Sequence, residues 1–112
     1  MVGRIQIGSR RSKYGAKKTI VDGIKFDSKA EAARYAVLQK LAHIGLIKNL
    51  RMQVVYKLAV NDQLICKYIA DFVYERNGIE VVEDVKGMRT REYILKRKLM
   101  KAVFGIQIKE TK

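Results

Sequence analysis

Hydrophobic and polar residues alternate along two neighbouring stretches in the second half of the chain, residues 64–74 and 79–86. Both stretches are rich in β-branched and aromatic side chains, and this pattern predicts two strands. The dipeptide Asn77-Gly78 lies between them and is typical of a two-residue turn that joins antiparallel strands. The register expected from such a turn pairs Arg76 with Ile79, Tyr74 with Val81 and Asp71 with Asp84.

A helical period replaces this alternation in two other segments. Ser28 and Glu31 have the spacing of a capping box, in which two side chains satisfy backbone groups at the start of a helix. Gly45 is the expected end of that helix, and a second helix is expected from about Thr90 to Gly105. The apolar positions expected to face the core are Ala30, Ala33, Val37, Leu41 and Ile44 in the first helix and Leu95, Leu99, Ala102 and Val103 in the second.

The remaining pattern completes an α/β fold. A short hairpin is expected around Asp22-Gly23, a strand over residues 52–60 and a last short strand over residues 106–109. The order is then helix, three-strand antiparallel meander, helix, strand. A right-handed crossover would return the last strand parallel to its neighbour. We therefore expect a mixed β-sheet flanked by helices.

Charge is distributed unevenly along the 112 residues. We assign residues 14–112 to a single domain and residues 1–13 to a flexible basic arm. The net charge of +13 comes from the two ends, because residues 1–18 carry +6, residues 19–85 are neutral and residues 86–112 carry +7. Two basic ends around a centre that holds most of the acids favour a polyanionic partner, which points to nucleic acid.

The rare residue types exclude several classes of site. One cysteine, Cys66, cannot form an intramolecular disulfide framework, and with the single histidine, His43, it argues against a structural zinc site. A metal ion would therefore be bound by carboxylates, which suit magnesium, manganese or calcium. No apolar run is long enough to span a bilayer, so we expect a cytoplasmic protein without a membrane partner.

The hairpin register creates an unusual cluster of charges. Asp71 and Asp84 oppose each other, and Lys86 lies two residues further along the same side of its strand. Like charges in directly opposed positions destabilise a sheet, and a divalent cation would remove this cost. Glu83 is also acidic but lies on the opposite face from Asp84, where we expect a solvated charge or a partner for basic residues.

The order of elements and the acidic motifs resemble the PD-(D/E)XK nuclease superfamily. That superfamily carries an acid at the end of one strand and an acid-x-lysine motif on the next, here Asp71 and then Asp84 with Lys86. No proline precedes Asp71, which departs from the superfamily signature. The motifs also look like those of small phage-encoded proteins assigned to the resolution of branched DNA: F-D-S-K-A-E at residues 26–31, Y-I-A-D-F-V-Y at 68–74 and E-D-V-K-G at 83–87.

This resemblance covers roughly residues 14 to 108 and implies a restriction-endonuclease-like core. It implies an endonuclease that depends on Mg²⁺, with Mn²⁺ as a substitute, and acts on branched DNA, Holliday junctions above all. Two symmetric incisions would require two active sites and hence a homodimer. The implied catalytic residues are Glu31, Asp71, Asp84 and Lys86, and the implied metal ligands are Asp71, Asp84, Glu31 and the carbonyl of Val85.

Phosphate contacts are expected from basic residues on both sides of this centre. They are Arg10, Arg11, Lys13, Lys17 and Lys18 near the N-terminus and Lys96, Lys98 and Lys101 in the second helix.

Three alternatives stay open on the sequence alone. Lys86 could serve as a salt bridge that neutralises the acid pair, and Tyr93 could lie near the cleft or in the core. The chain could be a non-catalytic binding module for structured nucleic acid, which needs the charge but no catalysis. It could also be a duplex or restriction-type nuclease that uses the same site.

Overall fold

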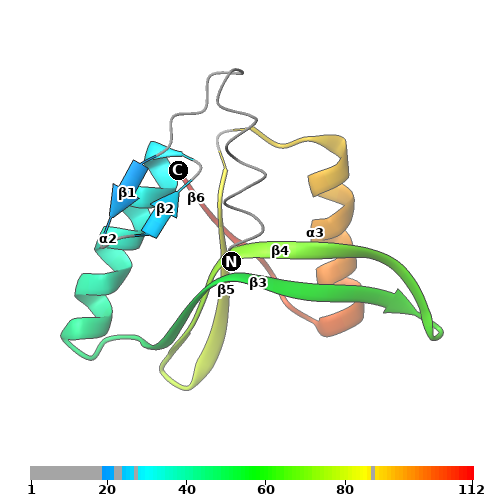
Figure 1. Ribbon diagram of the computed structural model, residues 1–112. Helices are drawn as coiled ribbons and strands as arrows, with labels where there is room; N and C mark the ends of the chain where they lie inside the picture. Colours follow the sequence, from blue (N-terminus) through cyan, green and yellow to red (C-terminus); the bar gives the residue numbers. More distant parts are fainter. Residues whose placement is uncertain (1–18, 22–23, 27, 87) are drawn as a thin grey trace.

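The computed structural model describes residues 19–21, 24–26, 28–86 and 88–112. The predicted basic arm and residues 22–23 of the first turn lie outside these ranges. Figure 1 shows the arrangement of the elements. They are β1 (Thr19–Val21), β2 (Ile24–Phe26), α2 (Lys29–His43), β3 (Lys48–Val60), β4 (Gln63–Arg76), β5 (Ile79–Val85), α3 (Arg91–Phe104) and β6 (Lys109–Thr111).

Four strands form a mixed sheet in the order β3-β4-β5-β6. The first three make an antiparallel meander, and β6 returns parallel to β5 after α3. The Asn77-Gly78 turn occurs where it was predicted, and Asn61-Asp62 forms the turn between β3 and β4. All four residues have positive φ angles, as two-residue hairpin turns require. The α/β class and the mixed sheet flanked by helices are thereby confirmed. β1 and β2 pair separately as a small antiparallel hairpin.

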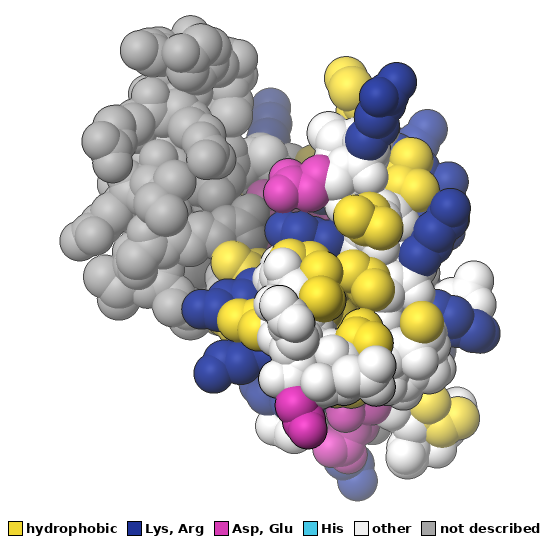
Figure 2. All heavy atoms as spheres, turned by 90° about the vertical axis from the view of Figure 1, so that its right-hand side faces the viewer, with side chains coloured by type: hydrophobic (Ala, Val, Ile, Leu, Met, Phe, Trp, Pro, Cys, Tyr) yellow, Lys and Arg dark blue, Asp and Glu magenta, His cyan; other side chains and the backbone are white. Residues whose placement is uncertain are grey.

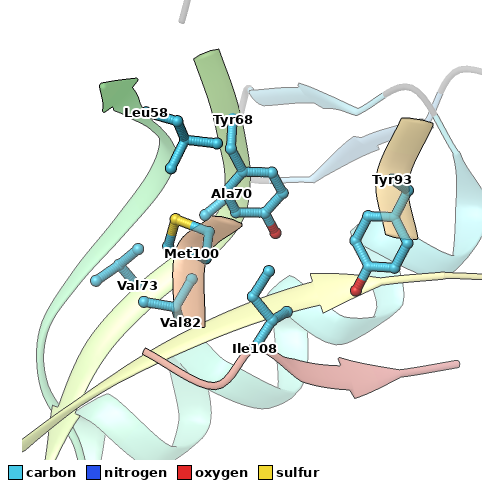
Figure 3. Packing of buried hydrophobic residues seen from close by; sticks show 8 residues of the cluster. All are labelled: Leu58, Tyr68, Ala70, Val73, Val82, Tyr93, Met100 and Ile108. Atoms are coloured by element: carbon cyan, nitrogen blue, oxygen red, sulfur yellow. The ribbon is translucent and has the colours of Figure 1, made fainter. Parts of the chain in front are cut away.

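The two long helices cover opposite faces of this sheet (Figure 1). Each helix packs on its own group of buried side chains, which we call the α3-side cluster and the α2-side cluster. The α3-side cluster is Leu58, Tyr68, Ala70, Val73, Val82, Tyr93, Met100 and Ile108, drawn in Figure 3. The α2-side cluster is Phe26, Ala32, Tyr35, Leu38, Ile47, Phe72 and Tyr74.

Helix α2 begins as predicted but buries a different face. Ser28 is the N-cap, and its hydroxyl accepts a hydrogen bond from the amide of Glu31 at 3.1 Å. The predicted apolar stripe is wrong except at Leu41, which packs against the α2-side cluster, because Ala30, Ala33, Val37 and Ile44 are exposed. The buried residues are Glu31, Ala32, Tyr35 and Leu38. A carboxylate lies on this buried face, and Tyr35 packs between Phe26 and Phe72, so the ring contacts outweigh the weaker alanine pattern.

Helix α3 and the last strand also differ in part from expectation. Thr90 caps the helix and Gly105 ends it in the left-handed conformation, as predicted. Leu95 and Ala102, which were expected to face the core, are exposed, whereas Tyr93 and Met100 are buried. The last strand is Lys109–Thr111 and not residues 106–109, because only this later segment runs beside the end of β5.

A buried ion pair fixes α2 to the sheet. Glu83 is fully buried on the α2 side, where Arg34 donates two hydrogen bonds to its carboxylate. Tyr74 Oη donates at 2.8 Å and Thr111 Oγ1 at 2.9 Å. The expectation that Glu83 lies on the opposite face from Asp84 and binds a basic residue is confirmed, and a solvated position is wrong. One carboxylate thus connects α2, β4, β5 and β6.

We predict that Arg34→Met lowers the free energy of unfolding by about 3 kcal/mol, because it leaves a buried carboxylate without its cation. Urea unfolding followed by circular dichroism measures the change. Arg76→Met is the matched control, since Arg76 is exposed and the loss should stay within about 0.5 kcal/mol. Equal losses in the two variants would contradict the assignment of Glu83 as an anchor.

The same carboxylate should make stability depend on pH. Burial alone would raise the pKa of Glu83, but hydrogen bonds from Arg34, Tyr74 and Thr111 hold it below its ordinary value of 4.5. Because the folded-state pKa lies below the unfolded one, the stabilisation is present above the unfolded pKa and is lost as pH falls through the folded pKa. We therefore expect the stability gap between wild type and Glu83→Gln to shrink on acidification from about pH 6 to about pH 3. A gap independent of pH would oppose this.

Candidate active site

The middle of β4 and the end of β5 bring the two predicted aspartates together. The observed pairs Phe72–Glu83, Tyr74–Val81 and Arg76–Ile79 follow the register expected from the turn. The paired residues end at Phe72 and Glu83, and the next residues along the two strands are Asp71 and Asp84. Asp71 Oδ2 accepts a hydrogen bond from the amide of Val85 at 2.8 Å, so Asp71 is fixed to the residue that follows Asp84. Both aspartates are buried, with exposed fractions of 5% and 3%.

The alternation of β3 and β4 breaks beside Asp71. Gln53, which lies across from Asp71 between two ladder pairs, has a φ angle of +55°, a left-handed conformation that is uncommon for a residue other than glycine. On β4, Ala70 belongs to the α3-side cluster and Phe72 to the α2-side cluster, although they are two residues apart. A regular strand would place both on one face. The strand therefore changes faces at Asp71.

This change of face allows Tyr68 to contact the site. Tyr68 Oη donates a hydrogen bond to Asp84 Oδ2 at 2.5 Å, and both groups are buried. Burial, followed by the hydrogen bond to Asp84, raises the pKa of the Tyr68 phenol above its usual value. Tyr68 thus remains a neutral donor near neutral pH and holds the Asp84 carboxylate in one orientation.

Lys86 lies on the other side of the same carboxylate. Its Nζ is 3.4 Å from Asp84 Oδ1 and 4.4 Å from the centroid of the Tyr93 ring, which attracts a cation electrostatically. Asp84 Oδ1 is buried, and no described group donates a hydrogen bond to it. A buried carboxylate oxygen without a donor is costly. One oxygen of the Asp84 carboxylate thus lies beside an ammonium group but accepts no hydrogen bond from a described group.

Tyr93 connects this centre to α3 and β6. The cap residue Thr90 accepts a hydrogen bond from the Tyr93 amide, which fixes the first turn of the helix. Tyr93 Oη donates to Glu110 at 2.7 Å, and Arg89 binds the same carboxylate at 2.7 Å. The hydrogen bond from Tyr93 is the main cause that lowers the pKa of Glu110, and Arg89 lowers it further. In Figure 3 the hydroxyl groups of Tyr68 and Tyr93 both point toward β5.

Glu31 approaches the same end of the sheet from the opposite face. It lies one helical turn before Arg34, whose guanidinium binds Glu83 at the end of β5. With an exposed fraction of 7% it is buried. Within residues 19–21, 24–26, 28–86 and 88–112, no three His, Cys, Asp or Glu side chains gather into a group that could hold a metal ion. The role of Glu31 as a ligand stays a prediction.

The predicted phosphate contacts divide into two groups. Arg10, Arg11, Lys13, Lys17 and Lys18 lie outside the described residues. Lys98 and Lys101 are exposed on α3, and Lys96 Nζ is 3.7 Å from Glu92. Figure 2 shows Lys and Arg side chains following one another along the edge of this face of the molecule, beside hydrophobic side chains.

Sequence reasoning missed Tyr68 and Glu110 as members of this centre. Tyr68 alternates with Cys66 and Ala70 along the stretch 64–74, and nothing in that pattern indicates a change of face three residues later. Glu110 is one of two acids in the basic C-terminal segment. That isolation was the available signal, because an acid surrounded by arginines and lysines tends to be engaged by them.

Comparisons with known proteins place the chain in a family without assigning an activity. None of the described helices is long and apolar enough to cross a membrane. A comparison with curated proteins finds no match. A family model described as "Protein of unknown function (DUF1064)" matches residues 11–111. This match covers most of the sequence, and the chain therefore belongs to the DUF1064 family.

Proposed function

We propose that the protein is a Mg²⁺-dependent endonuclease that hydrolyses phosphodiester bonds in branched DNA. The observation that carries the proposal is the buried Asp84 carboxylate, whose Oδ1 lacks a hydrogen-bond donor among the described groups and lies 3.4 Å from Lys86 Nζ. An acid pair on adjacent strands with a neighbouring lysine is the arrangement expected of a metal-assisted hydrolase. The burial of the two aspartates distinguishes this arrangement from a surface ion pair.

The donor set suits magnesium. Mg²⁺ is usually held by one or two carboxylates together with water and substrate phosphates, so a third carboxylate is not required. Asp71 and Asp84 would supply the two, and the carbonyl of Val85 would add a backbone ligand. Bound Mg²⁺ would polarise the scissile phosphate and neutralise the charge that develops on it. Mn²⁺, which prefers the same oxygen ligands, should substitute.

The other side chains orient the groups that react. Tyr68 holds Asp84 by a buried hydrogen bond, which leaves the second oxygen of that carboxylate for the metal. Lys86, positioned by Asp84 and the Tyr93 ring, would donate to a phosphate oxygen and stabilise the transition state while water attacks phosphorus and the leaving oxygen departs. Glu31 would position that water from α2.

Charge and resemblance define the substrate class. The net charge of +13 favours a polyanion, and the basic side chains along α3 would bind phosphates without reading sequence. Selectivity would then come from DNA shape, with the Holliday junction as the substrate that the resemblance favours. Cutting a junction symmetrically requires two sites, so we propose a homodimer that acts in the cytoplasm of the cell, or of the host cell if a phage encodes the protein.

Metal binding is predicted to depend on the aspartates. Saturating Mn²⁺ should raise the melting temperature of the wild type by several degrees, because a ligand that binds the folded state stabilises it. Asp71→Asn and Asp84→Asn should lose this rise in differential scanning calorimetry. Asp62→Asn is the control, since Asp62 is an exposed turn residue and should retain the rise. An undiminished rise in Asp84→Asn would place the metal elsewhere.

Junction cleavage is predicted to require Mg²⁺ and the acid–lysine centre. A labelled four-way junction should be cut by the wild type, stay intact in EDTA and be cut at least about a hundredfold more slowly by Asp84→Asn and Lys86→Gln. Both variants should still bind the junction in gel-shift assays, because the phosphate contacts on α3 are unchanged. Asp62→Asn should cleave at the wild-type rate.

The same assay separates the alternatives. A binding module predicts junction binding without cleavage in any divalent metal, and equal behaviour of the wild type and the Asp84→Asn protein. A restriction-type nuclease predicts that linear duplex is cut as fast as the junction. Intact junctions with the wild type in both Mg²⁺ and Mn²⁺ would reject the proposed activity.

A further inference from the structure

A basic pocket lies between the second half of α3 and the segment that leads into β6. It has a volume of about 220 Å³ and is lined by Arg97, Lys98, Lys101, Gln107 and Ile108. Three of these five side chains are cations, one is an amide that can donate hydrogen bonds, and none is acidic. Such a lining favours an anion. A pocket at the turn between β4 and β5 differs, because Lys48 and Glu75 both line it.

The guanidinium of Arg97 contains a hydrogen-bond donor from which no described group accepts. This donor is Nε, which is buried. Glu110 Oε2 lies 3.9 Å from Arg97 Nη1, which is beyond hydrogen-bond distance. Glu110 is also engaged by Tyr93 and Arg89 at shorter distances. A buried donor without an acceptor carries a free-energy cost that an anionic ligand would remove.

The C-terminal end of a helix normally disfavours anions, but the positive side chains of this pocket outweigh that effect. The carbonyl groups of a C-terminal turn carry roughly half a negative charge. Here the amides of Gly105 and Ile106 cap the carbonyls of Lys101 and Met100 at 2.9 and 3.3 Å. The pocket adds three full positive charges from its own side chains. The positive charge is therefore the larger contribution.

The pocket lies in line with the proposed active site along α3. Tyr93, whose ring contacts Lys86, precedes Arg97 by one helical turn and Lys101 by two. These steps correspond to about 6 and about 12 Å along the helix axis. Successive nucleotides of one DNA strand rise by about 3.4 Å. The separation between the acid–lysine centre and the pocket therefore corresponds to roughly two to four nucleotides of a DNA strand that follows α3.

We propose that this pocket binds a backbone phosphate of the DNA strand, roughly two to four nucleotides from the phosphodiester that occupies the acid–lysine centre. Arg97 supplies the buried donor, the exposed Lys98 and Lys101 supply positive charge, and Gln107 supplies an amide donor from the segment that leads into β6. The inference rests on the DNA-binding part of the proposed function. It adds a defined anion subsite that fixes the direction of the strand relative to Asp84, without reading its sequence.

The test is the salt dependence of binding to a four-way junction in EDTA, where no cleavage occurs. One phosphate contact contributes about 0.9 to the slope of log K against log salt. Arg97→Gln and the double variant Lys98→Gln with Lys101→Gln should each reduce the slope by about one. The triple variant should reduce it no further, because all three residues serve one phosphate.

Lys40→Gln is the matched control, since Lys40 lies in the last turn of α2, as Lys101 does in α3, and is likewise exposed. Its slope should equal that of the wild type. A slope that falls further in the triple variant than in the single and double variants would show that binding depends on diffuse positive charge, and it would overturn the assignment of the pocket. An equal fall in Lys40→Gln would do the same. An unchanged slope in both pocket variants, or no junction binding by the wild type, would also overturn it. If the slopes of the pocket variants fall as predicted but the wild type shows no Mg²⁺-dependent cleavage, the nuclease activity is rejected and the phosphate pocket is retained.

Discussion

The candidate site depends on the change of face at Asp71. In a regular strand Tyr68 and Asp71 would point to opposite sides of the sheet. The left-handed Gln53 on the neighbouring strand lies where the alternation of β4 breaks, and Tyr68 faces α3 and contacts Asp84. A backbone conformation of this kind costs of order 1 to 3 kcal/mol and persists only where surrounding structure holds it. Here it places a phenol donor and two carboxylates within one buried centre.

Two adjacent acids on β5 perform opposite tasks because a strand alternates. Glu83 faces α2, where Arg34, Tyr74 and Thr111 satisfy its carboxylate and fix α2 and β6 to the sheet. Asp84 faces α3, where Tyr68 satisfies one oxygen and the other has no described donor. The completely satisfied carboxylate stabilises the scaffold, while the incompletely satisfied one retains capacity for a ligand. The contacts of Glu83 thus fix, from the α2 face, the strand that carries Asp84 on the other face.

Local signals predicted much of this arrangement, and tertiary contacts decided the rest. The Asn77-Gly78 turn was sufficient to predict the β4–β5 register, and Ser28 and Thr90 indicated the starts of both helices. The buried face of α2 was not predictable from its apolar period, because ring packing of Tyr35 sets it. Tyr68 was also beyond prediction, since its orientation depends on a positive φ angle in a different strand.

The adjacency of Glu83 and Asp84 also restricts how this hairpin can vary in length. An insertion or deletion of one residue between the Asn77-Gly78 turn and Glu83 would exchange the faces of the two acids. Asp84 would then face α2 together with Lys86, which shares its side of the strand, and Glu83 would face α3. Substitutions on the exposed residues of this hairpin disturb neither role. Among relatives, we expect this segment to diverge in composition while its length stays constant.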